Sequence, residues 1–249
     1  MIERYTRPEM GHLWSIQNEW QTILNVEIAA CEAMAELGEI PAAAVENIKA
    51  KAKFDVARIN EIEKTTDHDI IAFLTNLEEN IGEDSKYIHK GLTSSDVKDT
   101  AYCVMMRDAA AIILDDLQEF RTVLRRRANE FRHTPCIGRT HGIHAEPMTF
   151  GLKLLLWSAE IERDIERLTH AKKIVSVGKL SGAVGTYLSY YQQPCFDHSF
   201  PRYWQRLYAI LGRRRQPHSS RKTRYRNRND ESVLPARTFW DNKSTYQST

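Results

Sequence analysis

The spacing of apolar residues predicts helices throughout the first three quarters of the chain. Apolar side chains recur at helical spacing from Glu9 to about Leu37, which predicts one helix that stops at Gly38. Three shorter helices are predicted from Pro41 to about Lys53, from the cap Asp55 toward Thr65, and from Asp69 to Ile81 before Gly82. Because no alternation with a period of two competes with these patterns up to Tyr187, we expect no strand there.

The longest pattern begins at the cluster Thr93-Ser94-Ser95-Asp96, whose hydroxyl and carboxylate oxygens suit the start of a helix. An apolar stripe then continues to Phe131 without Pro or Gly, which predicts a rod of roughly 50 Å. Such a helix is typical of an elongated bundle, often one shared between subunits. After an irregular stretch from Pro135 to Glu146, a further helix is predicted from Pro147 to about Lys173. The fold class is therefore all-α.

The composition changes at Leu188. From there to Thr249 the chain carries 12 Lys and Arg against 4 Asp and Glu, a net charge of +8. The first 187 residues carry 23 Lys and Arg against 29 Asp and Glu, a net charge of −6. Prolines divide this tail into short windows, and only Arg202 to Leu211 is compatible with a brief helix. We expect weak order throughout the tail.

Composition also restricts the class of protein. No run reaches the roughly 18 apolar residues that a membrane span needs, and the first ten residues are polar and charged, so we expect a cytoplasmic protein without a membrane partner. The four cysteines have no C-x-x-C spacing, so we expect free thiols, with neither a disulfide framework nor a zinc site.

Two polar islands lie between the predicted helices. The first, from Thr65 to Asp69, contains His68, a residue type suited to proton transfer, with carboxylates beside it that can fix the tautomer of its ring. A histidine beside a helix cap often has only a structural role, so both interpretations stay open. The second, from His89 to Asp96, places hydroxyls and free N–H groups at a helix N-terminus. This arrangement fits an anion-binding site, and it fits simple capping of the helix equally well.

The third island, from Gly138 to Pro147, favours function over structure. It gathers Arg139, His141, His144 and Glu146 between glycines that allow close approach of a ligand to the backbone. Its H-x-x-H spacing could also suggest a metal site, but no third cluster of ligands accompanies it. We therefore expect proton transfer or anion binding, and no metal.

These islands carry a resemblance to a known family. In chain order the blocks ERYTRPEM, TTDHD, GLTSSDVKDTA, GRTHGIHAEPMTFG and GKLSGAVGTY resemble the adenylosuccinate lyase family of the fumarase/aspartase superfamily. The resemblance covers about 187 residues. Families that cleave argininosuccinate or act on muconates share the helical bundle, but the pairing of TTDHD with GRTHGIHAEP favours the adenylosuccinate member.

The resemblance implies an activity and a set of site residues. The family eliminates fumarate from adenylosuccinate and from succinyl-carboxamide ribotide in purine synthesis, as a homotetramer whose sites combine three subunits, and needs no metal or organic cofactor. His141 matches the general acid, His68 a histidine that supports it, and His89 another that lines the site. The resemblance places further substrate contacts at the positions of Arg4, Tyr5, Asp67, Asp69, Thr93 and Ser94, of which Thr93 and Ser94 hold a substrate carboxylate.

The resemblance also implies a division of the chain into three parts. Residues 1–92 correspond to an N-terminal helical domain, 93–187 to part of the central helical bundle, and 188–249 to a basic tail foreign to the family. Our hypothesis is that the tail is a frameshifted translation, because period, charge and motifs all change at one point. Coding DNA that lacks codons for the family's serine loop, SSAMPHKRNP, in every downstream frame would contradict it.

Two departures from the family affect the expected activity. Some relatives carry Arg where this chain has Asp67, so an anion here would weaken binding of an anionic substrate. The serine loop, which supplies the general base, has no counterpart in this sequence, so we expect the chain to be inactive alone. Two alternatives are another lyase of the superfamily and a helical interaction module whose Arg-rich, aromatic tail binds nucleic acid, which we consider less fitting.

Overall fold

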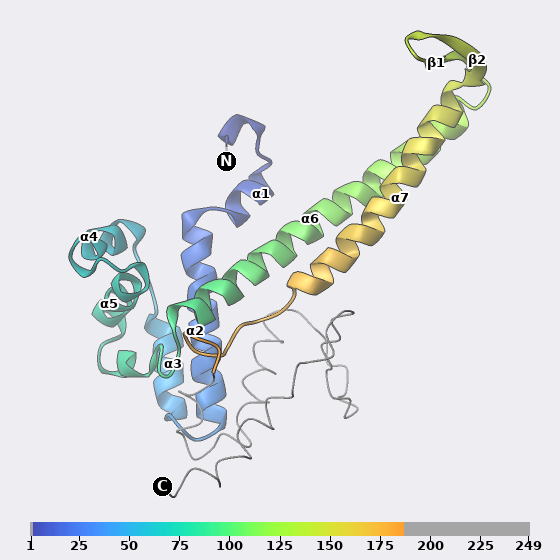
Figure 1. Ribbon diagram of the computed structural model, residues 1–249. Helices are drawn as coiled ribbons and strands as arrows, with labels where there is room; N and C mark the ends of the chain where they lie inside the picture. The colour runs from blue at the N-terminus through green and yellow to red at the C-terminus, as the bar shows by residue number, and fades with distance from the viewer. Residues whose placement is uncertain (1, 187–249) are drawn as a thin grey trace, which may run out of the picture. The chain divides into compact units, whose positions relative to one another are not determined.

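The computed structural model describes residues 2–186. The predicted tail from Leu188, with its brief helix at Arg202–Leu211, lies outside the described residues. The described elements, shown in Figure 1, are η1 (Glu3–Tyr5), α1 (Pro8–Leu13), α2 (Ile16–Glu36), α3 (Ala42–Lys51), α4 (Val56–Thr66), α5 (Asp69–Ile81), η2 (Glu83–Tyr87), α6 (Ser94–Glu130), β1 (Pro135–Thr140), β2 (Ile143–Thr149) and α7 (Phe150–Val175). The fold is helical apart from one small hairpin, which confirms the all-α class. No helix among residues 2–186 is both long and apolar enough to cross a membrane.

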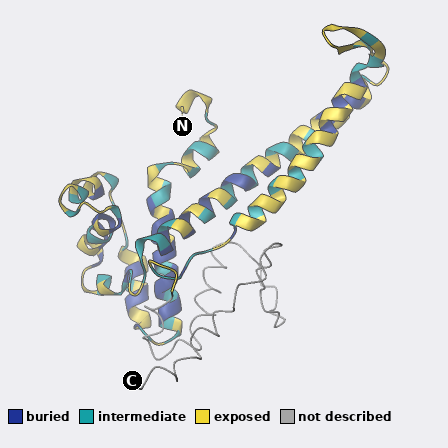
Figure 2. Ribbon diagram, in the orientation of Figure 1, coloured by how far each residue is buried: buried dark blue, intermediate teal, exposed yellow. Residues whose placement is uncertain are grey.

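Helices α2, α3, α4 and α5 enclose the main hydrophobic core. At its centre the rings of Trp20 and Phe73 stack with centroids 4.8 Å apart, and both side chains are buried. Val97 and Ala101, in the first turns of α6, join the same core. Figure 2 shows this concentration of buried residues at one end of α6. The boundary that we predicted between residues 92 and 93 stays a prediction.

The N-terminus of α6 is fixed by the buried carboxylate of Asp96. Thr93, the first residue of the cluster predicted to start this helix, is the N-cap, and its N–H donates to Asp96 Oδ2 at 3.1 Å in a capping box. Asp96 Oδ1 lies 2.8 Å from Lys179 Nζ and accepts from the backbone N–H of Ser181 at 2.9 Å. One side chain thus caps the helix and holds the segment that follows α7 against it.

Helix α7 returns along α6, and the two helices meet closely at Gly151. A Cβ atom at this position would lie 2.4 Å from the carbonyl oxygen of Ala128 and 2.7 Å from Cα of Arg132, so any larger residue would push the helices apart. Leu124, Ala128 and Leu154 form a small apolar cluster beside this contact. Most of α7 beyond it is exposed, as Figure 2 shows.

The expectation of an irregular stretch followed by a helix from Pro147 was wrong. Residues 135–149 form an antiparallel hairpin in which Thr140 pairs with Ile143, and Pro147 lies in β2 rather than at a helix start. His141 and Gly142 make the two-residue turn, with φ of 51° and 75°. Positive φ at both positions is what a type I′ turn requires, and glycine adopts it readily. The strands are short and largely exposed, so they lack the apolar alternation that would have predicted them.

The single helix predicted from Glu9 to Leu37 is two helices. Helix α1 ends at Leu13, and Ser15 caps α2 by accepting a hydrogen bond from the N–H of Asn18 at 3.2 Å. The apolar spacing continues across this break, so periodicity alone could not reveal it. The local side-chain cap interrupts the helix there.

Replacing Asp96 with alanine is expected to lower the free energy of unfolding by about 3 kcal/mol, because it leaves the Lys179 ammonium without its buried partner. Urea unfolding followed by circular dichroism measures the change. Asp99→Ala removes an exposed carboxylate from the same helix and should change the free energy by less than about 0.5 kcal/mol. Equal effects of the two substitutions would contradict the role given to Asp96.

Candidate functional site

The first two polar islands meet at the N-terminus of α6. His68 is the N-cap of α5, and its Nδ1 accepts a hydrogen bond from the N–H of Ile71 at 3.3 Å. The ring proton therefore belongs on Nε2, which lies 3.5 Å from Ser94 Oγ. The N–H groups in the first turn of α6, other than that of Asp96, which the Thr93 cap accepts, point in the direction that favours an anion. Two residues predicted from separate islands thus form one polar cluster.

Asp69, beside His68, is held by Lys98 from the second turn of α6. Lys98 Nζ lies 2.5 Å from Asp69 Oδ2. Partial burial on its own would raise the pKa of Asp69, but the hydrogen bonds from Lys98 and from the N–H of Ile70 outweigh it and lower that pKa below its ordinary value. The hydrogen bond to Asp69 likewise raises the pKa of Lys98. Asp69 therefore forms an ion pair with Lys98 across the α5–α6 contact.

His89 lies in the loop between η2 and the α6 cap, where it contacts Glu27 of α2. His89 Nδ1 is 2.5 Å from Glu27 Oε1, and the backbone N–H of His89 donates to Glu27 Oε2 at 3.0 Å. Glu27 is completely buried, whereas the His89 side chain is 17% exposed. Glu27 is not among the residues that the sequence predicts for the site. A charged residue within the apolar stripe of α2 was the available signal.

Positive backbone φ angles mark three of the predicted site residues. Among the described residues other than glycine, only Asp67, His89 and His141 have φ above zero, at 49°, 60° and 51°. This region is uncommon for residues with a side chain, and it is enriched at functional sites. Asp67 ends α4 in this conformation with an exposed side chain. Each of the three polar islands contains one of these strained residues.

Arg4 and Tyr5 lie away from the α6 N-terminus. Both are exposed in η1, with the Arg4 guanidinium 5.3 Å from the centre of the Tyr5 ring. The adjoining Arg7 forms an ion pair with Asp116 of α6. Asp116 follows Ser94 by 22 residues, which is about 33 Å of helix. The predicted N-terminal contacts therefore belong to the middle of the rod.

His141 lies farther still from His68 within one chain. It occupies the turn of the hairpin that follows the C-terminal end of α6, and its side chain is exposed. Helix α6 has 37 residues and spans about 55 Å between this end and Ser94. Figure 1 shows the hairpin at the end of α6 opposite to α5. The structure therefore does not bring the predicted acid and its supporting histidine together in one copy.

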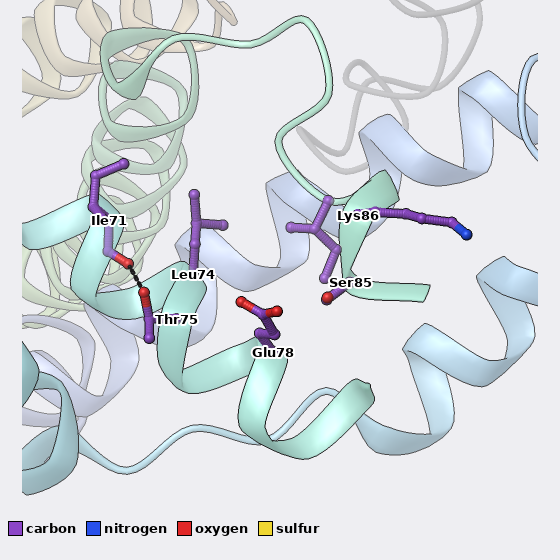
Figure 3. Close-up of a pocket in the computed structure, with 7 residues that line it drawn as sticks. Ile71, Leu74, Thr75, Glu78, Ser85 and Lys86 are labelled. Atoms are coloured by element: carbon purple, nitrogen blue, oxygen red, sulfur yellow. Dashed lines mark hydrogen bonds between the residues drawn. The ribbon is translucent and has the colours of Figure 1, made fainter. Parts of the chain in front are cut away.

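A pocket of about 230 Å³ lies between α5 and η2. Figure 3 shows Ile71, Leu74, Thr75 and Glu78 along one face of α5, with Glu78 directed toward Ser85 of η2. None of the residues predicted for the site lines it. Within residues 2–186, no group of three or more His, Cys, Asp or Glu side chains could hold a metal ion.

The profile of a protein family described as Lyase matches residues 3–225. The chain belongs to this lyase family. The matched region covers the α6 N-terminus, the long rod and the hairpin, and it continues past Tyr187, where the sequence analysis ended the resemblance. The placement of the predicted tail boundary stays a prediction.

Named relatives agree with this assignment. The chain is 54% identical over 187 residues to the adenylosuccinate lyase of Synechocystis sp. and 52% identical over 187 residues to that of Bacillus subtilis, which is 75% of this chain and 43% of each relative. The chain therefore spans less than half the length of the curated relatives it matches.

Solved structures of the superfamily share the fold. A fumarate lyase from Mesorhizobium sp. superposes with a TM-score of 0.73 at 31% identity, over 82% of this chain and 48% of that one. A 3-carboxy-cis,cis-muconate lactonizing enzyme from Pseudomonas putida gives 0.74 at 27% identity, over 84% and 47%. The helical arrangement around α6 is thus that of a fumarase/aspartase-superfamily lyase.

Replacing Lys98 with methionine is expected to raise the pKa of Asp69, since burial then acts without the opposing ammonium. In the wild type the pKa of Asp69 is lower in the folded than in the unfolded chain. Its ionised carboxylate therefore stabilises the fold fully at a pH above about 4, the ordinary pKa of aspartate, and this contribution is lost as the pH falls further. Carbon-13 NMR of the Asp69 carboxyl group during an acid titration measures this pKa in the wild type and in Lys98→Met. Lys64→Met is the control. Lys64 is an exposed residue of α4, and its replacement should leave the midpoint of the Asp69 titration unchanged.

Proposed function

We propose that this lyase chain supplies part of the site for the adenylosuccinate lyase reaction in the cytoplasm, the release of fumarate from adenylosuccinate and from succinyl-carboxamide ribotide, and that it is inactive alone because it has no serine loop. The observation that carries this proposal is the contact of His68 with Ser94 at the N-terminus of α6. The identity of more than 50% to two adenylosuccinate lyases supports the choice of substrate.

The residues fit the elimination in separate steps. A base removes the proton from the carbon next to a carboxylate, the C–N bond breaks, and an acid protonates the departing nitrogen. The N–H groups of α6, with Thr93 and Ser94, suit the carboxylate of the carbanion-like state, which needs positioned donors. His141, exposed in a rigid two-residue turn, suits the acid.

The separation of these groups along α6 requires more than one copy of the chain. Within one chain about 55 Å of helix lies between Ser94 and the hairpin of His141, too far for one substrate to bridge. A second copy that lies antiparallel along the rod would bring its own hairpin to the first copy's His68. We therefore propose that the chain acts in an assembly of the tetrameric kind expected for the intact family, together with partner copies that carry the serine loop absent from this sequence, and does not turn over substrate alone.

Apolar side chains on the rod support such an assembly. Leu152, Leu155 and Leu156 of α7 are 52–57% exposed, and Ile113 and Phe120 of α6 are 42% and 48% exposed. Large apolar groups at helical spacing on two adjacent helices are typical of an interface rather than of a solvated surface. Covering this face with further helices would complete a bundle.

Mixing experiments test the proposal. The partner is the full-length Bacillus subtilis relative in which the histidine aligned with His141 is replaced by alanine. We expect fumarate release from adenylosuccinate in the mixture but from neither protein alone, because this chain supplies the hairpin acid and the partner supplies the rest of the site. The absorbance change on loss of the succinyl group measures the rate.

Matched variants of this chain make the result specific. His141→Ala should abolish the activity of the mixture. His133 is an exposed residue just before the hairpin, and His133→Ala should leave the activity within about twofold of that of the unsubstituted mixture. Native mass spectrometry verifies that mixed assemblies form. Mixed assemblies without activity, or full activity of this chain alone, would contradict the proposal.

A further inference from the structure

Glu27 is a carboxylate buried in the main core. It lies on α2 with no exposed surface, one helical turn before Cys31. Burial, followed by the negative charge of Glu27, raises the pKa of Cys31 to about 12, as expected where water is excluded. A carboxylate in such a place strongly destabilises the fold unless donors compensate it. Glu27 must therefore serve an interaction that an apolar residue could not make.

Both oxygens of this carboxylate are directed to His89. Oε2 accepts the backbone N–H at 3.0 Å, and Oε1 faces the ring Nδ1 at 2.5 Å. Within the described part of the chain, these two contacts account for the hydrogen bonds of Glu27. The pair joins residues 62 positions apart, so it is a tertiary contact and not part of the helix.

The same contacts hold His89 in its left-handed conformation. A φ of 60° is unfavourable for a residue with a side chain, and such a conformation persists only where surrounding structure enforces it. The turn that follows, in which the N–H of Leu92 donates to the His89 carbonyl at 3.2 Å, leads directly to the Thr93 cap. The orientation of the His89 ring is thus tied to the start of α6.

We propose that Glu27 is the positioning residue for His89. It keeps a proton on Nδ1 and turns the ring so that Nε2, which has no hydrogen-bond partner in the described residues, is presented to substrate. A carboxylate that fixes the tautomer of a histidine in this way leaves the second nitrogen with one defined role. The inference rests on the proposed function for the identity of the substrate, but the geometry of the pair stands independently.

A purely structural role for Glu27 is the competing explanation. A carboxylate with only a structural role would hold the loop through the backbone N–H of His89, and its removal would lower stability without a specific effect on the state of the ring. The two roles differ in what happens to the His89 ring. That difference decides the choice of experiment.

NMR of the full chain tests the geometry without any assay. Long-range proton–nitrogen correlation spectra of the histidine rings should show the His89 proton on Nδ1 in the wild type. In Glu27→Leu the ring should lose this fixed state, and in Glu27→Gln, whose amide oxygen still accepts a hydrogen bond, it should recover part of it. Glu32→Leu, on the same helix but paired with Lys49 at 3.2 Å, is the control and should leave the ring unchanged.

Kinetics test the consequence in a second mixture, in which the full-length Bacillus subtilis relative carries alanine at the histidine aligned with His89, so that an active site must use His89 of this chain. Glu27→Leu should lower kcat/KM for adenylosuccinate by about tenfold or more, as loss of a carboxylate that orients a histidine does at metal sites. Glu27→Gln should recover part of the rate. In a His89→Ala background the effect of Glu27→Leu should disappear, because the ring that it positions is absent.

The outcomes separate this inference from the proposed function. A wild-type ring with its proton on Nε2, or a ring unchanged by Glu27→Leu, overturns the inference whether or not the mixture is active. An undiminished effect of Glu27→Leu in the His89→Ala background also overturns it and leaves a structural role. A mixture that is inactive while the NMR result holds contradicts the proposed function alone.

Discussion

The unbroken helix α6 is the constraint on which the arrangement of the functional residues depends. Its 37 residues hold three groups at fixed places: His68 and Ser94 at the start, the segment of Arg4 and Tyr5 near the middle, and the His141 hairpin beyond the end. A helix of about 55 Å cannot fold back on itself. The proposed function therefore requires several rods to pack side by side, and the exposed leucines of α7 suit that packing.

Two buried carboxylates organise the polar end of this rod. Asp96 caps α6 and fixes the segment after α7 through Lys179, while Glu27 fixes the loop that precedes the cap through His89. Both carboxylates are removed from water and compensated by specific donors, so each defines one geometry rather than adding general stability. In the sequence, Ser94 lies between His89 and Asp96. The contact of His68 with Ser94 is therefore made in the short segment that these two carboxylates hold.

The opposite end of the rod depends on a turn. His141 and Gly142 adopt positive φ angles in a two-residue connection, and Gly151 allows α7 to start against the end of α6 without a gap. The hairpin gives the histidine a defined position at the tip of an exposed structure. An exposed histidine in such a turn is suited to the role of acid in a site formed by another copy, as the proposed assembly requires.

The sequence by itself determined the helices whose ends are set locally. Asp55, His68 and Thr93 cap α4, α5 and α6 near the predicted residues, because caps and apolar periods involve neighbours within one or two turns. The hairpin was missed because exposed strands leave no apolar alternation, although His-Gly between two short runs was a usable turn signal. Only the tertiary structure decided the pairing of Glu27 with His89 and of Asp96 with Lys179, and the separation of His141 from His68. Those contacts join residues 62 and 83 positions apart, and no local pattern specifies which distant donor will meet a buried carboxylate.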